Sequence, residues 1–187
     1  MRTPGAPDPA VAAAEEAEDW MARSAAPSVW KAVARGGEVG VDVIEMKTGL
    51  ERPHVISGDP RGPIMHVRPD SPAHVHAHEW GHLVEMAMPG VLAAARAFLA
   101  SRTAGAPLLP VSQLARAWRP DDLVRPGLAD PYWGLDGVPG RTATEVVSGG
   151  FGAMQRSPGE FFVADPEHWA LTTAVLAGDF FDSGRNG

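Results

Sequence analysis

The pattern of hydrophobic and polar positions predicts helices near both ends of the chain and short strands between them. Residues 10–34 have a helical period, with acidic side chains on one side and tryptophan, methionine and valine as apolar anchors. Proline removes a helix hydrogen bond and clashes with the preceding turn, so we expect Pro27 to divide this segment into two helices. Residues 1–9 are rich in proline and glycine, which predicts a mobile N-terminus.

The period changes in the next part of the chain, where alternating β-branched residues predict short strands. Valine at positions 39, 41 and 43 is typical of a half-buried strand. Two more strands are expected at 54–56 and 62–68, separated by a turn rich in glycine and proline. Because an exposed strand edge can pair with an extended peptide, the strand at 62–68 is predicted to lie along a binding cleft.

A long helix is predicted after these strands, at residues 71–88. Ser71 suits the cap position of this helix, and Pro72 suits its first helical position. Pro89 and Gly90 are expected to end it, and the apolar residues at 91–102 predict a second helix.

Residues 104–140 contain six prolines, which predicts a long irregular connection. Such a connection in a compact domain is usually either functional or disordered. Two helices are expected beyond it, at 142–155 and 165–177. The second of these begins with Asp165 and Pro166, the residue types typical of a helix cap and of the first helical position.

Composition narrows the class of protein. The 187 residues are 44% hydrophobic and 21% charged, which is ordinary for a globular protein with a sizeable core. The net charge of −7 repels a phosphate backbone, so nucleic acid is not expected as a partner. Cysteine is absent, which excludes thiolate metal ligands and leaves histidine and carboxylate. The N-terminus lacks a signal-peptide pattern and Arg96 interrupts the longest apolar stretch, so we expect neither secretion nor a membrane span.

Four of the seven histidines lie between residues 74 and 82, in HVHAHEWGH. His78 and His82 are four positions apart, so on a helix both imidazoles face one side and can reach the same tetrahedral ion. Glu79 lies beside the open metal position, where it can take a proton from a water activated by zinc. This spacing predicts a zinc site with His78 and His82 as ligands. Two histidines packed on a helix without a metal are the alternative.

A catalytic zinc needs a third protein ligand and an open fourth position. The metzincin pattern would require glycine at position 85 and histidine at 88, where this chain has Glu85 and Met88. That class is therefore rejected, and a later glutamate is expected instead. Among the candidates we favour the one in a helix of small residues, which can pack closely against the metal helix; the candidates are Glu145, then Glu160 and Glu167, and the nearer Glu85.

The remaining histidines are not assigned to the metal. His74 lies one turn before His78 and can sit near the ion, but we interpret both His74 and His76 as exposed or cap-proximal polar residues. His66 on a predicted strand and His168 on the last predicted helix receive no role.

Two of these segments resemble a known family. HEWGHLVE is similar to the metal helix of gluzincin metallopeptidases, and TEVVSGGFGAM to their downstream glutamate helix. DPYWG at 130–134, GRTATEVVS at 140–148 and DPEHWALTTAVLAG at 165–178 resemble the zincin-like domain of phage minor head and head-morphogenesis proteins. The resemblance covers roughly residues 50–180. A further tyrosine common before the glutamate helix in that family is missing from GLDGVPGR.

The resemblance implies His78, His82 and Glu145 as zinc ligands, Glu79 as general base, and Tyr132 as a catalytic residue that stabilises the oxyanion. A tyrosine that only packs is the alternative for Tyr132. The implied fold is α+β and zincin-like, with a small N-terminal sheet, the HExxH helix and a helical C-terminal part. We expect one such domain at 38–187, after a helical segment at 10–37 and the mobile residues 1–9.

Two functions follow from this interpretation. The first is a zinc-dependent endopeptidase that acts on a peptide or protein substrate, in the cytoplasm of a host cell or in a virion. The second is a phage virion or head-assembly protein that keeps a zincin fold with a mainly structural metal and contacts other phage structural proteins. A toxin-like protease directed at a host is a weaker third option.

Overall fold

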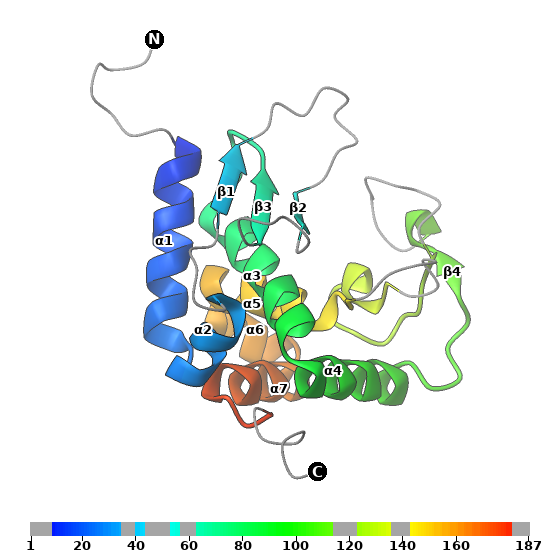
Figure 1. Cartoon of the computed structure of the whole chain (residues 1–187). Helices are drawn as coiled ribbons and strands as arrows, with labels where there is room; N and C mark the ends of the chain where they lie inside the picture. The colour runs from blue at the N-terminus through cyan, green and yellow to red at the C-terminus, as the bar shows by residue number, and fades with distance from the viewer. Residues whose placement is uncertain are drawn as a thin grey trace.

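The computed structural model describes residues 9–34, 40–43, 53–56, 63–113, 123–135 and 143–180. Within them the protein is mostly helical, with a small sheet near the N-terminus (Figure 1). The predicted mobile residues 1–8, the predicted turn at 57–62 and the proposed boundary at residue 38 lie outside the described residues.

Two helices, α1 (Pro9–Ser24) and α2 (Pro27–Ala34), begin the described chain. The predicted division at Pro27 is confirmed, because α2 starts at this residue. The buried side chains Met21, Val29 and Val33 belong to the same core cluster as residues of the central helix α3. Trp30 of α2 stacks on Trp80 of α3 with 4.9 Å between ring centroids, so the N-terminal helices cover one side of α3.

The sheet consists of β1 (Gly40–Val43), β2 (His54–Ile56) and β3 (Ile64–Val67). Its order is β1-β3-β2, with β1 parallel and β2 antiparallel to β3. The prediction of an exposed edge on the third strand is therefore wrong, since β3 is paired on both sides. Its side chains explain the central place, because Ile64, Met65 and Val67 are all buried. The edge nearer α3 is β2.

Helix α3 (Ala73–Ala87) runs through the middle of the molecule, and α4 (Pro89–Arg102) follows after a bend of 110°. Two predictions about helix ends are wrong. Pro72 rather than Ser71 is the cap residue of α3, because the Ser71 hydroxyl instead accepts a hydrogen bond from the Arg68 N–H. Pro89 begins α4 rather than only ending α3, since proline needs no N–H partner in a first turn.

No single helix in the described ranges is long and apolar enough to cross a membrane, and α3 and α4 reach that length only as a bent pair.

The proline-rich connection contains short ordered pieces where the structure describes it. Strands β4 (Leu109–Pro110) and β5 (Leu123–Val124) form an antiparallel pair, and 3-10 turns occupy Val111–Gln113 and Pro131–Gly134. Three helices complete the chain: α5 (Val146–Arg156), α6 (Pro158–Ala164) and α7 (Pro166–Ala177). The predicted cap is confirmed, since the Asp165 side chain accepts from the His168 N–H at 3.1 Å.

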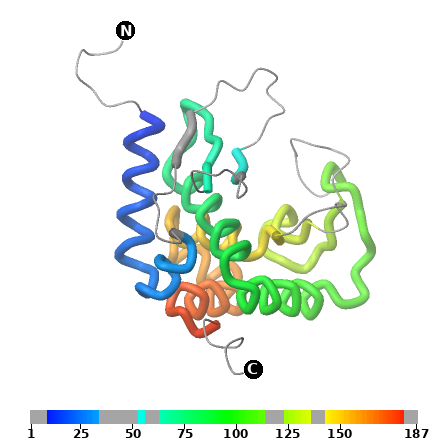
Figure 2. Tube along the Cα trace, in the orientation of Figure 1, coloured from blue at the N-terminus to red at the C-terminus, as the bar shows by residue number. Residues whose placement is uncertain are grey.

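Helix α5 packs closely against α3, and Figure 2 traces how the C-terminal helices return beside α2 and α3. Gly81 of α3 makes this approach possible, because a Cβ there would lie 2.4 Å from the Cα of Ser148. Gly152 faces the backbone of His74 and the side chain of His78 in the same way. The two helices therefore run antiparallel and nearly touch through their backbones.

Candidate metal centre

Three side chains meet where α5 begins against the middle of α3. The Nε2 atoms of His78 and His82 lie 3.0 and 3.4 Å from the same Oε2 atom of Glu145. Potential ligand atoms of the three residues all lie within 4.8 Å of one another. The structure thus brings together the two histidines of the HExxH pattern and the glutamate favoured from the sequence.

Local structure explains how each of these side chains is placed. His78 and His82 are one turn apart on α3, and their rings meet edge to face with centroids 4.9 Å apart. Glu145 is the residue immediately before the first turn of α5, and its side chain makes no capping hydrogen bond. Its carboxylate reaches across to α3 instead, which the close helix contact at Gly81 permits.

Two hydroxyl groups also hold the Glu145 carboxylate. The Tyr132 hydroxyl donates to Oε1 at 3.0 Å, and the Ser148 hydroxyl donates to Oε2 at 3.1 Å. Tyr132 belongs to the 3-10 turn at Pro131–Gly134, which the side chain of Asp130 caps by accepting from the Tyr132 N–H. Tyr132 is therefore at the site, with its ring centroid 6.5 Å from that of His78. The contact of Ser148 was not predicted, although its place one turn after Glu145 is a signal in the sequence.

Glu79 of α3 lies next to the cluster formed by His78, His82 and Glu145. Only 2% of Glu79 is exposed, and its Oε2 atom has no hydrogen-bond partner in the described part of the chain. Burial raises the pKa of this carboxyl group, while the nearby imidazoles of His78 and His82 act in the opposite direction. An unsatisfied buried polar atom costs about 1–3 kcal/mol, which is the kind of cost found where a ligand or water belongs.

The electrostatics of the cluster are those of a coupled acid and base. Burial alone would lower the pKa of His82, but the carboxylates of Glu145, Glu79 and Glu85 outweigh it and raise this pKa to about 9. Burial alone would raise the pKa of Glu145, but His82 and His78 lower it well below its usual range. Without a metal, a protonated His82 therefore balances the charge of Glu145.

The centre opens into a cavity of about 880 Å³ between α3, α5 and α6. His78 and Glu79 line it together with Tyr132 and Trp133. His74 lines it one turn farther along α3, half-buried. The cavity reaches the side of the cluster where Glu79 and Tyr132 lie.

The other candidate ligands do not belong to this cluster, although Glu160 lines the same cavity. Glu160 is exposed on α6, and Glu167 binds Arg102 with 3.3 Å between Oε2 and Nη1. The carboxylate of Glu85 faces Thr144 instead of the histidines, a contact that was not predicted. No local pattern indicates it, because the two residues are 59 positions apart.

Two histidines differ from expectation. His76 is fully buried, so its interpretation as an exposed or cap-proximal residue is wrong; it lies on the side of α3 that faces the interior. His168, which received no role, is also buried, and its Nε2 lies 2.7 Å from the carbonyl oxygen of Val146, next to Glu145.

The donor set fits a divalent transition metal. Two imidazole nitrogens and one carboxylate are a combination that catalytic zinc uses, with a fourth position left open. Glu79, whose Oε2 atom is buried without a hydrogen-bond partner among the described residues, lines the cavity beside these donors. The identity of the ion does not follow from these atoms, since the same donors also bind other first-row metals.

No family model matches this chain, and neither the curated proteins nor the solved structures contain a significant match.

Proposed function

We propose that the protein is a zinc-dependent metallopeptidase of the gluzincin type, with His78, His82 and Glu145 as the metal ligands. The observation that carries this proposal is the approach of one buried Glu145 oxygen to both imidazoles, at 3.0 and 3.4 Å. Such an arrangement of donors beside an accessible cavity is what metal-assisted hydrolysis requires.

A zinc ion bound there would polarise the scissile carbonyl and lower the pKa of the attacking water. With zinc bound, Glu79 would accept a proton from the attacking water and return it to the leaving amine. Burial raises the pKa of Glu79 above its usual range, which favours its holding a proton between the two steps. Its unpartnered Oε2 leaves it an acceptor position for this proton.

Tyr132 assists in this proposal by supplying a hydrogen bond to the developing oxyanion. Tyr132 lines the cavity, and in this proposal its hydroxyl turns from Glu145 to donate to a bound substrate. The cavity is large enough for several side chains of an extended peptide, and a peptide or protein is the substrate class we propose.

One observation favours the second function, a structural metal in a phage virion or head-assembly protein. The carboxylate of Glu145 is already held by Tyr132 and Ser148, so this tyrosine is engaged in fixing a ligand. A metal in such a site contributes folding free energy without turnover. The resemblance to phage head proteins supports a location in a virion or a host cell for both functions.

The test compares Glu79→Gln with Glu18→Gln, a matched change at an exposed position of α1 far from the centre. Zinc content is measured by elemental analysis, and turnover is measured on an unstructured protein such as casein. For the enzyme we expect zinc in both variants and a loss of about 10²–10⁴-fold in kcat for Glu79→Gln only.

Equal turnover in Glu79→Gln and Glu18→Gln would refute the catalytic role. Zinc bound by the wild type with no turnover on any peptide would favour the structural function. A wild-type chain that binds no zinc would contradict both functions.

A further inference from the structure

We propose that Glu85 is a positioning residue of the metal centre, which fixes the turn carrying Glu145 to the helix that carries His78 and His82. This inference rests on metal binding at the proposed site. It goes beyond the ligand set, because it assigns a task to a buried carboxylate that touches neither the cavity nor the ligand atoms.

Thr144 gives both of its hydrogen-bond donors to this one carboxylate. Its backbone N–H lies 2.6 Å from Oε2 of Glu85, and its hydroxyl donates to Oε1. Glu85 is only 1% exposed and Thr144 only 7% exposed. The two residues thus form a closed pair, with each carboxylate oxygen satisfied by the same partner.

The position of the pair connects it to the metal centre. Glu85 follows His82 by three positions, so it lies one turn farther along the same helix. Thr144 immediately precedes Glu145 in the chain. Helix α3 therefore supplies two ligands and also binds Thr144, the residue before the third ligand. This contact fixes the position at which the Glu145 backbone enters α5.

The same turn is held from its other side. The Val146 N–H donates to the Thr144 hydroxyl oxygen at 3.1 Å, and the Val146 carbonyl faces Nε2 of His168 at 2.7 Å. Glu145 consequently sits between two anchored residues, and only its side chain remains to be oriented. Tyr132 and Ser148 hold that side chain.

A carboxylate is a costly means of fixing a turn in a buried place. Its burial raises the pKa of Glu85, and the Thr144 hydrogen bonds act against this rise. A hydrophobic residue would fill the same volume without that cost. What only the carboxylate provides is two acceptors in a fixed plane, which determine both the position and the direction of Thr144.

Residues that orient metal ligands typically change metal affinity by about 10–100-fold when they are removed. We expect an effect in this range for Glu85→Gln, since the amide offers a donor where Thr144 also donates. Thr144→Val keeps the side-chain shape but removes the hydroxyl. We expect Thr144→Val to weaken zinc binding less than Glu85→Gln does. Thr144→Ser keeps the hydroxyl and should bind zinc with the wild-type affinity.

The experiment uses the full chain and measures zinc affinity by competition with a chromophoric chelator, at a temperature where circular dichroism shows each variant folded. Thr172→Val is the matched control, because Thr172 is equally buried but its hydroxyl bonds to the His168 carbonyl within α7. The unfolding of the metal-free proteins in urea is measured in parallel. The visible spectrum of the cobalt-substituted proteins provides a readout of ligand geometry.

A positioning role predicts weaker zinc binding and an altered cobalt spectrum for Glu85→Gln and Thr144→Val, with Thr172→Val unchanged. A purely structural role predicts lower stability of the metal-free protein with unchanged affinity and spectrum, and that result would overturn the inference. Should Glu85→Gln fail to fold, the Thr144→Val and Thr144→Ser pair decides the question alone. A wild type that binds no zinc would contradict the proposed function itself. That result differs from a failure of the Glu85 inference, in which the wild type still binds zinc.

Discussion

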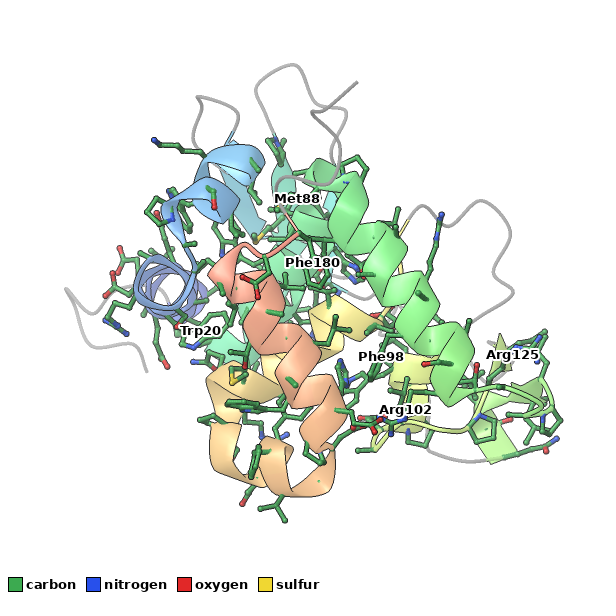
Figure 3. All side chains as sticks on the ribbon, turned by 90° about the horizontal axis from the view of Figure 1, so that it is seen from below. Trp20, Met88, Phe98, Arg102, Arg125 and Phe180 are labelled. Carbon is green, nitrogen blue, oxygen red and sulfur yellow. The ribbon has the colours of Figure 1, made fainter. Side chains whose placement is uncertain are left out.

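Two buried carboxylates, Glu145 and Asp165, occupy equivalent places in the fold but differ in the charge that balances them. Each is the residue preceding a C-terminal helix, and they are 1% and 2% exposed. Asp165 is paired with Arg102 of α4, whose Nη1 lies 2.7 Å from Oδ1. Figure 3 shows Arg102 and Phe98 between α4 and α7. Glu145 meets the imidazoles of His78 and His82.

The difference separates a permanent ion pair from an exchangeable one. A guanidinium keeps its charge at every pH that a protein tolerates, so Arg102 and Asp165 can only be structural. An imidazole is cationic only when protonated, and it can give up that proton to bind a metal ion. Glu145 therefore belongs to a cluster that could hold a metal ion in place of a proton, whereas Asp165 belongs to a fixed ion pair.

The largest expected effect is a stabilisation by zinc that depends on one of these two clusters only. At a free zinc concentration 1,000 times the Kd, binding adds about 4.1 kcal/mol to the free energy of unfolding. His82→Ala should abolish this gain. Arg102→Met should lower the free energy of unfolding of the zinc-free protein but keep the full gain from zinc. Urea unfolding with and without zinc measures both. A zinc gain that survives in His82→Ala would mean that the ion binds elsewhere.

The next effect concerns the helix contact on which the Glu145 cluster depends. Gly81→Ala forces a Cβ to within 2.4 Å of the Ser148 Cα, so we expect a loss of about 3 kcal/mol from overpacking. Gly159→Ala is the control, because a Cβ in that α6 position meets nothing within 4 Å. It should stabilise the protein by about 0.5–1 kcal/mol. Equal effects in urea unfolding would contradict the close packing of α3 and α5.

A smaller loss is expected when the permanent pair is broken. Arg102→Ala leaves Asp165 buried without its countercharge and frees the Gly127 carbonyl that Arg102 also binds. We expect a cost of about 2 kcal/mol, since Arg102 is partly exposed and water can reach the gap. Zinc affinity should not change. A change in zinc affinity would show that the two clusters are coupled and that the contrast between them is false.

The smallest effects are slopes of stability against pH in the metal-free protein, below about 1.4 kcal/mol per pH unit for one proton. The folded pKa of His82 is raised from 6.5 to about 9, so its contribution is complete below 6.5 and is lost as pH rises toward 9. The folded pKa of Asp165 is lowered below 3.8: burial acts to raise it, but Arg102 outweighs burial. Its contribution is therefore lost as pH falls through that lowered value.

Two variants separate these slopes when unfolding is followed by circular dichroism across pH. His82→Ala should flatten the alkaline decline. Arg102→Ala should remove the part of the acid decline that Asp165 contributes and leave the part that Glu145 contributes. Saturating zinc should also remove the alkaline decline, because the bound ion replaces the proton. An alkaline decline that persists in His82→Ala would assign it to another group.

The sequence predicts the local parts of this fold well. The division at Pro27, the helix around His78 and His82, and the Asp165 cap each depend on residues within one or two turns of one another, and each is confirmed. The prediction of Glu145 rather than Glu160 depends on packing between helices that are far apart in the sequence. A helix of small residues can approach α3 closely. Gly81 and Ser148 supply that contact.

What the sequence does not predict depends on partners far along the chain. Periodicity indicates a strand at Ile64–Val67, but strand order is decided by which neighbours pair with it, so its central place could not be foreseen. The burial of His76 depends on what covers α3, and the role of Glu85 on a threonine 59 positions later. Neither has a local signal.

The spacing of the ligands along the chain also determines when the site can exist. His78 and His82 emerge during synthesis well before Glu145, which follows His82 by 63 positions (145 − 82). At about 5–20 residues per second, the intervening segment takes roughly 3–13 seconds to make. Throughout that interval the growing chain has the HExxH helix but neither Glu145 nor the Thr144 contact that places it. The centre can therefore form only after Glu145 has been made and α5 can pack against α3.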